Sequence, residues 1–281
     1  MRPRGDLSIL LLLAVVFYLS VRSESMPPGA RPGSAVALAQ SSPATGESTA
    51  GKPAAASVVP FPFIECRRAS GPIEIDGKAD EPAWKQAMVV DRFANFWSPQ
   101  PAFTPTRAGL LWDDEYLYFF AEMEDVDLYA DVTERDGETW LNDVFELFFK
   151  PAGSELGYYE FQVNAKGTQM DMFLPSRGSG GYRRWARDAE FRWNTSVELR
   201  GTLNKWEDDD NGWSAEGRIP WSDFRHTGGK PSAGDRWGCA LCRYDYSKLF
   251  VAPQLSTAAP LTRADFHRYE DYVELRFIGE K

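Results

Sequence analysis

One apolar run in the middle of the chain constrains the fold more than any other stretch. From Val144 to Phe149 every residue is apolar except Glu146, which is the pattern of a β-strand covered on both faces. Side chains alternate along a strand, so Glu146 shares one face with Val144 and Phe148. An unpaired carboxylate is costly to bury. We therefore expect Glu146 to meet a partner or to open into a cleft.

Trp140 lies shortly before this strand, where Gly137 predicts a loop. A tryptophan on such a loop and a carboxylate in the adjoining strand are groups that a sugar site uses. The ring stacks on the apolar face of a pyranose, and the carboxylate accepts hydrogen bonds from the sugar hydroxyls. A structural alternative has Trp140 covering the core and Glu146 paired with an arginine. The stretch alone leaves both interpretations open.

Many further short apolar segments, separated by turn signals, predict an all-β protein. Strands are expected at 64–68, 73–75, 107–112, 116–122, 144–149, 158–164, 169–174, 196–203, 212–220, 237–244 and 272–278. The segments 77–87 and 221–224 predict short helical turns, and no stretch has the periodicity of a long amphipathic helix. Roughly ten strands without a sequence repeat predict a single antiparallel β-sandwich.

The first 60 residues differ in composition from the rest of the chain. Within residues 1–25, two arginines precede an apolar run at 7–21, which has the length of a signal peptide and is short for a membrane span. An uncleaved N-terminal anchor is the alternative. Residues 26–60 are rich in Pro, Ala, Gly and Ser, which predicts a disordered linker. The folded domain is therefore expected at 61–281, secreted, periplasmic or on the cell surface.

The charge and the rare residue types exclude several classes of function. The formal net charge of −10 disfavours nucleic acids and anionic membranes, because both attract basic patches. A membrane contact is expected only through an uncleaved anchor. Two histidines are too few for a His-rich metal site. The ten tryptophans favour a protein that stacks on a ligand.

The three cysteines do not make a closed set of disulfides. Cys239 and Cys242 are expected on opposite faces of one strand, so they cannot easily bridge each other. We interpret all three as thiols of the core. A bridge from Cys66 to one of the other two is the alternative.

A series of short motifs follows the chain in order. They are Ile75-Asp76-Gly77 with Glu81–Trp84, Leu111–Tyr118, Asn142–Glu146, Tyr158–Phe161, Gly212-Trp213 with Glu216 and Ile219–Trp221, Gly234–Trp237 with Cys242-Arg243, and Phe266-His267. Together they resemble the carbohydrate-binding module family 9 proteins, a β-sandwich group related to the DOMON superfamily. The resemblance spans residues 64–278.

The resemblance implies a sugar site in which two tryptophans sandwich a terminal sugar ring. Trp140 precedes Glu146 by the spacing of the first tryptophan and a strand glutamate in that family. Asn164 and Arg243 match positions at which the family places polar groups. The implied ligand-binding residues are therefore Trp140, Glu146, Asn164 and Arg243, and the implied partner is a glycan or polysaccharide.

The second tryptophan of that clamp is missing. The resemblance places it near Ala258, within the run Ser256–Pro260. Tyr269 and Trp185 are aromatic residues that could substitute for it. Loss of one stacking ring would weaken a sugar site by about 1 kcal/mol.

The resemblance also implies structural calcium. Asp208, Asp209 and Asp210 precede Gly212 and supply the oxygen ligands and the turn glycine of such a site. A solvated turn is the alternative for this run. A second acidic cluster consists of Glu122, Glu124, Asp125 and Asp127. No organic cofactor is expected.

Three functions compete on the sequence. The first is a secreted, non-catalytic carbohydrate-binding domain, which we expect. A glycosidase pair of Asp143 and Glu146 fails, because residues three apart in a strand point to opposite faces. A hydrolase accessory role is compatible with the first. A DOMON-like haem domain would need His267 with a methionine as axial ligands.

Overall fold

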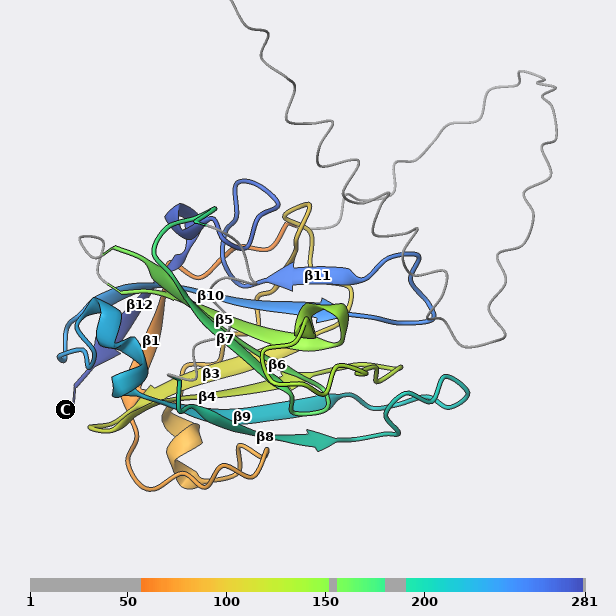
Figure 1. Ribbon diagram of the computed structural model, residues 1–281, viewed down its shortest axis with the longest axis horizontal. Helices are drawn as coiled ribbons and strands as arrows, with labels where there is room; N and C mark the ends of the chain where they lie inside the picture. Colours follow the sequence, from red (N-terminus) through yellow and green to blue (C-terminus); the bar gives the residue numbers. More distant parts are fainter. Residues whose placement is uncertain (1–56, 152–155, 180–190, 280–281) are drawn as a thin grey trace, which may run out of the picture. The chain divides into compact units, whose positions relative to one another are not determined.

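The computed structural model describes residues 57–151, 156–179 and 191–279. The expected signal peptide or anchor at 1–25, the linker up to residue 56, and Trp185 lie outside these residues. The described part consists mainly of β-strands and loops (Figure 1). The strands are β1 (Phe63–Arg68), β2 (Ala94–Asn95), β3 (Thr106–Trp112), β4 (Tyr116–Met123), β5 (Val144–Lys150), β6 (Tyr158–Asn164), β7 (Gln169–Leu174), β8 (Asn194–Leu199), β9 (Trp213–Pro220), β10 (Arg236–Asp245), β11 (Gln254–Thr257) and β12 (Val273–Ile278).

The helices of the described residues are short 3-10 helices. They are η2 (Pro82–Gln86), η3 (Thr139–Leu141), η4 (Trp221–Thr227) and η5 (Tyr269–Asp271). The helical turns predicted at 77–87 and 221–224 correspond to η2 and η4. No helix in the described ranges has the length and apolar character needed to cross a membrane.

The strands form one hydrogen-bonded sheet of 12 strands. Its order is β7-β6-β5-β10-β12-β1-β3-β4-β9-β8, and β11 joins β10 to β2. The all-β prediction is confirmed, whereas the two layers of a sandwich stay a prediction. The purely antiparallel arrangement is wrong at β1, which runs parallel to both β12 and β3. Strand β1 lies between β12 and β3 in the sheet, and no tight hairpin connects it to either strand. No turn therefore forces β1 to run antiparallel to them.

Three details of the strand prediction were also wrong. Strands β2 and β11, with 2 and 4 residues, are too short to give a pattern. The apolar segment Ile73–Ile75 is not a strand. Ile73 packs instead against Trp84 and Leu111 in a small cluster, so its apolar character serves side-chain packing outside the sheet.

The main core is dense in aromatic rings. Phe145, Leu147 and Phe149 of β5 point into it. Buried tryptophans are Trp84, Trp112, Trp193, Trp213, Trp221 and Trp237. Six of the ten tryptophans therefore stabilise the fold, because burial of such large rings contributes strongly to core energetics. The tryptophan count alone was a poor guide to ligand binding.

A second apolar cluster covers the opposite side of β5, β6, β7 and β10. We call this side the second face. Its buried members are Phe148, Tyr158, Met170, Met172, Leu174, Ala240, Cys242, Ala259 and Phe266, and the partly exposed rings of Phe96, Trp140, Tyr244, Tyr269 and Tyr272 pack against them. Every cysteine is a buried free thiol, so the core-thiol prediction is confirmed. Burial raises the pKa of each thiol.

Candidate functional site

Strand register brings three polar side chains together on the second face. Glu146 of β5 pairs with Gln162 of β6. Glu160, two residues before Gln162 on β6, lies on the same face of the sheet and pairs with Phe148 of β5. All three side chains are buried, Glu146 with an exposed fraction of 2%. Alternation along β5 is the reason, because the residues on either side of Glu146 point into the main core.

These polar groups form a hydrogen-bonded chain that stops short of Glu146. Thr139 Oγ1 donates to Gln162 Oε1 at 2.5 Å, and Gln162 Nε2 donates to Glu160 Oε1 at 2.6 Å. Glu160 Oε2 has no hydrogen-bond partner among the described residues. The carboxylate of Glu146 likewise accepts no hydrogen bond from the described part of the chain, and no arginine there pairs with it. The second face thus carries acceptor oxygens that lack protein donors.

The electrostatics of the two carboxylates follow from burial. Burial raises the pKa of Glu146, and the charge of Glu160 raises it further. Burial also raises the pKa of Glu160, against the opposing influence of His267 and Gln162. His267 Nδ1 lies 3.9 Å from Glu160 Oε2 and 3.0 Å from the hydroxyl of Tyr158. Hydroxyl donors from a bound molecule would stabilise the ionised carboxylates.

Aromatic rings lie on the same face of the sheet as these carboxylates. Trp140 sits in η3, directly after Thr139, and is half-buried against the second-face cluster. Its carbonyl oxygen accepts a hydrogen bond from the Tyr246 hydroxyl at 2.9 Å. Tyr269 in η5 packs on the same cluster, with its ring centroid 5.3 Å from that of Tyr158. The structure therefore places Trp140, Glu146 and Tyr269 on one face of the sheet.

Ala258, the expected place of the second clamp tryptophan, does not lie on this face. Its side chain is 2% exposed and belongs to the main core. Its amide donates to the carbonyl of Leu241 in β10. A tryptophan at this position would overpack the core instead of completing a clamp.

The two remaining predicted ligand residues are engaged elsewhere. Asn164 donates to Val132 O and Asn142 Oδ1, both at 2.9 Å, and its Oδ1 accepts the amides of Lys166 and Thr168. It therefore fixes the turn after β6 and a neighbouring loop. No amide atom of Asn164 is left over for a ligand.

Arg243 lies on the opposite side of the sheet from Glu146. Its Nη2 donates to the carbonyl of Glu124 at 2.7 Å and to Asp125 Oδ2 at 3.1 Å, and Asp245 Oδ2 lies 3.4 Å away. The arginine is fully buried. The structure therefore separates Arg243 from the second face and gives it buried carboxylates as partners.

A compact acidic cluster surrounds this arginine. Asp125, Asp143 and Asp245 each offer a carboxylate oxygen within 4.8 Å of the others, and all three are buried. Burial and the charge of Asp245 raise the pKa of Asp125 to about 7. Burial and both neighbouring carboxylates raise that of Asp143. Asp245 Oδ1 has no hydrogen-bond partner in the described ranges. Arg243 thus contacts two of the three carboxylates, those of Asp125 and Asp245.

The acidic run predicted to bind calcium is not arranged as one site. Asp208 pairs with Lys205, and Asp209 with Lys248. Asp210 accepts the amides of Leu128 and Thr202. One signal for the cluster around Arg243 was visible in the sequence, because Asp125 stands in the second acidic run. Asp143 and Asp245 are too distant in sequence to be grouped with it by spacing.

Buried carboxylates and aromatic rings on one face of a sheet are groups that can bind a carbohydrate. The chain belongs to one such family: the sequence model described as "Carbohydrate family 9 binding domain-like" matches residues 75–266. That description names a binding domain and no catalytic activity.

Comparison with individual proteins agrees with this family. The chain is 26% identical over 158 residues to endo-1,4-beta-xylanase A of Thermotoga maritima, a match that covers 54% of the chain but 12% of that enzyme. A family 9 module of Caldicellulosiruptor kristjanssonii in complex with cellotriose has a TM-score of 0.52 at 17% identity, covering 77% of this chain and 95% of the module. Its complex with glucose gives the same TM-score at 16% identity, covering 77% and 97%.

A putative carbohydrate-binding protein of Bacteroides uniformis has a TM-score of 0.60 at 15% identity, covering 76% of this chain and 98% of that protein. At these identities the solved structures show a shared fold.

Proposed function

We propose that this chain is a secreted, non-catalytic domain that binds a glycan on the second face. Trp140 stacks on a sugar ring, while Glu146 and Glu160 accept hydrogen bonds from its hydroxyls. The observation that carries the proposal is the pair of buried carboxylates of Glu146 and Glu160 on a face with aromatic rings, where Glu160 Oε2 has no hydrogen-bond partner among the described residues. Support comes from the structural relatives, of which one was solved with cellotriose and one with glucose.

The chemistry of a sugar suits this face in two ways. A pyranose hydroxyl that donates to a carboxylate makes a charge-assisted hydrogen bond, which is stronger than a neutral one. The apolar side of the ring covers an indole at the same time. Tyr269 is our candidate for the second ring, because it lies on the same face as Trp140. Export through the apolar segment 7–21 would deliver the domain to extracellular glycans.

The haem alternative gains no support from the second face. His267 Nδ1 contacts the Tyr158 hydroxyl, and Met170 and Met172 are buried in the apolar cluster. An absorbance spectrum of the purified protein tests this alternative, since bound haem gives an intense Soret band.

We further propose that calcium binds at the acidic cluster of Asp125, Asp143 and Asp245. The oxygen donors suit Ca²⁺, and the unpartnered Asp245 Oδ1 and the excess of carboxylates over arginine leave negative charge to neutralise. The bound ion would supply that positive charge. Asp208, Asp209 and Asp210 do not form such a group among the described residues, where the three oxygens within 4.8 Å of one another belong to Asp125, Asp143 and Asp245.

The test of the glycan site is Trp140→Ala. Titration calorimetry of the full chain with cellotriose should show a large loss of binding, because the stacking ring is removed. Stability should fall less than in Trp213→Ala, which removes a fully buried ring and costs about 3–5 kcal/mol. A Trp140→Ala protein that is strongly destabilised yet binds cellotriose normally would show that the ring covers the core and does not bind sugar.

A further inference from the structure

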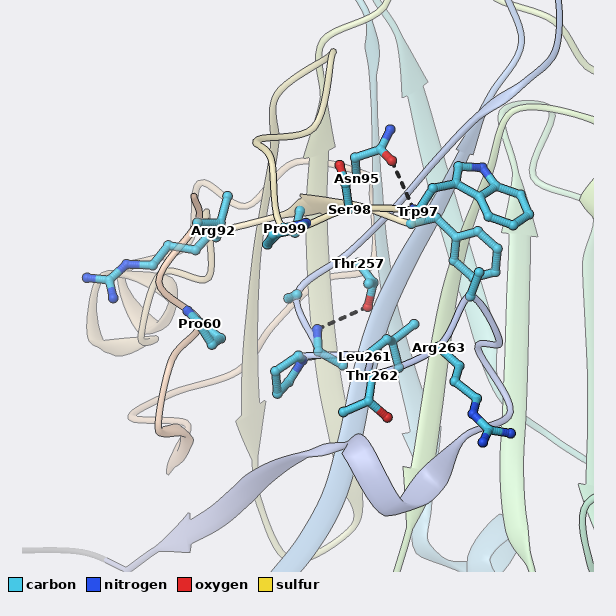
Figure 2. Close-up of a pocket in the computed structure, with 17 residues that line it drawn as sticks. Pro60, Arg92, Asn95, Trp97, Ser98, Pro99, Thr257, Leu261, Thr262 and Arg263 are labelled. Atoms are coloured by element: carbon cyan, nitrogen blue, oxygen red, sulfur yellow. Dashed lines mark hydrogen bonds between the residues drawn. The ribbon is translucent and has the colours of Figure 1, made fainter. Parts of the chain in front are cut away.

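A separate pocket of about 390 Å³ lies where β2 and β11 pair (Figure 2). Three segments line it: residues 58–60, residues 92–99 and residues 257–264. Neither Glu146 nor Trp140 lines it, so it is distinct from the site described above. Phe96, Ala259 and Leu261 belong both to its lining and to the second-face cluster. The pocket therefore adjoins the second face, and its volume is within the range of small-molecule sites.

Trp97 gives this pocket an open aromatic surface. Its side chain is 67% exposed, although most large rings of the described residues are buried. Its amide donates to Asn95 Oδ1 at 2.9 Å, and its ring meets Phe96 edge-on at 4.8 Å. Phe96 in turn packs against Phe266 of the second face at 4.5 Å. An indole that is held in place but exposed beside a pocket is suited to stack on a ligand ring.

The charged groups of the pocket are positive. Its described lining residues include Arg92 and Arg263 but no Asp or Glu, in a chain with a net charge of −10. Figure 2 shows the two arginines on opposite sides of the pocket. Arg92 Nη1 makes a 3.4 Å hydrogen bond to Val59 O, and its guanidinium stacks on Phe61. Neither arginine has a carboxylate partner among the described residues.

Other exposed arginines of the described residues do have a carboxylate partner. Arg107 pairs with Glu122 and Arg177 with Glu270, each at 2.6 Å. Arg263 thus lies without a carboxylate partner among the described residues on the same side of the pocket as Trp97, and Arg92 lies without one on the other side (Figure 2). An arginine recognises a carboxylate through charge-assisted hydrogen bonds.

We infer that this pocket binds an acidic sugar unit, a uronic acid within the glycan. Trp97 stacks on the ring of that unit, and Arg92 or Arg263 binds its carboxylate. The inference rests on the proposed glycan site, since the shared residues Phe96 and Leu261 make the pocket a continuation of the second face. The inference names the class of ligand: glycans that carry a uronic acid are preferred to neutral glycans.

The test uses titration calorimetry of the full chain with matched trisaccharides. One is cellotriose; the others carry glucuronic acid in place of the glucose at one end or the other. At low salt the better acidic analogue should bind about five-fold tighter than cellotriose, and this advantage should shrink as salt is added. The double variant Arg92→Ala, Arg263→Ala should abolish the advantage, so that the acidic analogues bind no more tightly than cellotriose.

Two further variants sharpen the result. Trp97→Ala should weaken binding of the acidic analogue. The matched control is Arg200→Ala, which removes an exposed arginine that donates only to backbone carbonyls, those of Asn211 and Trp213; it should keep the advantage. If neither acidic analogue binds more tightly than cellotriose, or if the double variant keeps the preference, the inference is wrong while the glycan site stands. If no trisaccharide binds, both are wrong.

Discussion

Glu146 links the proposed site to the stability of the fold. Its carboxylate lies beside Glu160 without a protein donor in the described ranges, and its pKa is raised above the ordinary value of 4.5. The folded state therefore binds this proton more tightly than the unfolded chain. The stability that this group contributes is present at low pH and is lost as pH rises through the raised pKa. A sugar hydroxyl would provide the missing donor.

Glu146→Gln tests this role at the level of one residue. The amide keeps the shape but not the charge, so a charge-assisted contact of about 1.5–3 kcal/mol becomes a neutral one of about 0.5–1.5 kcal/mol. Cellotriose should bind about ten-fold more weakly. The free energy of unfolding at neutral pH should rise or stay the same, because repulsion with Glu160 is relieved. Calorimetry and chemical denaturation measure the two effects.

The matched control is Glu134→Gln, which changes an exposed glutamate and should alter neither quantity. A Glu146→Gln protein that loses stability but keeps its affinity for cellotriose would instead mean that the charge of Glu146 has a structural role.

At the scale of the element, β10 carries different chemistry on its two faces. Cys242 pairs with Glu146 and belongs to the second face, whereas the adjacent Arg243 pairs with Phe145 and points to the acidic cluster. The Nη1 of Arg243 also reaches Pro105 O at 3.2 Å, at the start of β3. This arginine therefore connects β10 to the loop after β4 and to the segment before β3.

Arg243→Met should destabilise the protein and leave glycan affinity unchanged. Removing one partner of a buried ion pair costs about 3–5 kcal/mol, because the carboxylates that remain are uncompensated. The denaturation midpoint reports this loss, and calorimetry with cellotriose on the folded protein reports affinity. Arg236→Met, which changes an exposed arginine of the same strand, is the control. Weak binding by an Arg243→Met protein of normal stability would restore the ligand role implied by the resemblance.

Local sequence patterns predicted most of the strands and the face of Glu146, because alternation acts over a few residues. They could not predict which face of the sheet Arg243 occupies. That face depends on the register between β10 and β5, which are nearly 100 residues apart in the chain, and no turn signal specifies such a register. Glu160 and Gln162 were missed for the same reason. Their site emerges only when β6 is aligned beside β5.

At the scale of the whole molecule, buried carboxylates set the response to pH and, at the proposed calcium site, the expected response to calcium. Burial raises the pKa of Asp125 from 3.8 to about 7, and that of Glu216 from 4.5 to about 7. Without calcium, these groups lower the free energy of unfolding as pH rises from their pKa in the unfolded chain to their raised pKa in the folded protein. Calcium binds ionised carboxylates, so its stabilisation should run in the opposite direction and grow with pH.

The measurement is the melting temperature with excess calcium and with a chelator, at pH 5 and pH 7.5. A ligand at about 100 times its dissociation constant stabilises the native state by about 2.7 kcal/mol, which corresponds to a rise of about 5–10 °C for a domain of this size. We expect that rise at pH 7.5 and a much smaller one at pH 5, where protons compete for Asp125 and Asp143.

Asp125→Asn should abolish the response, whereas Asp209→Asn should retain it, because Asp209 is exposed and pairs with Lys248. The reverse pattern would place the ion in the Asp208–Asp210 run, and a melting temperature that chelation leaves unchanged in the unmodified protein would remove calcium from the fold.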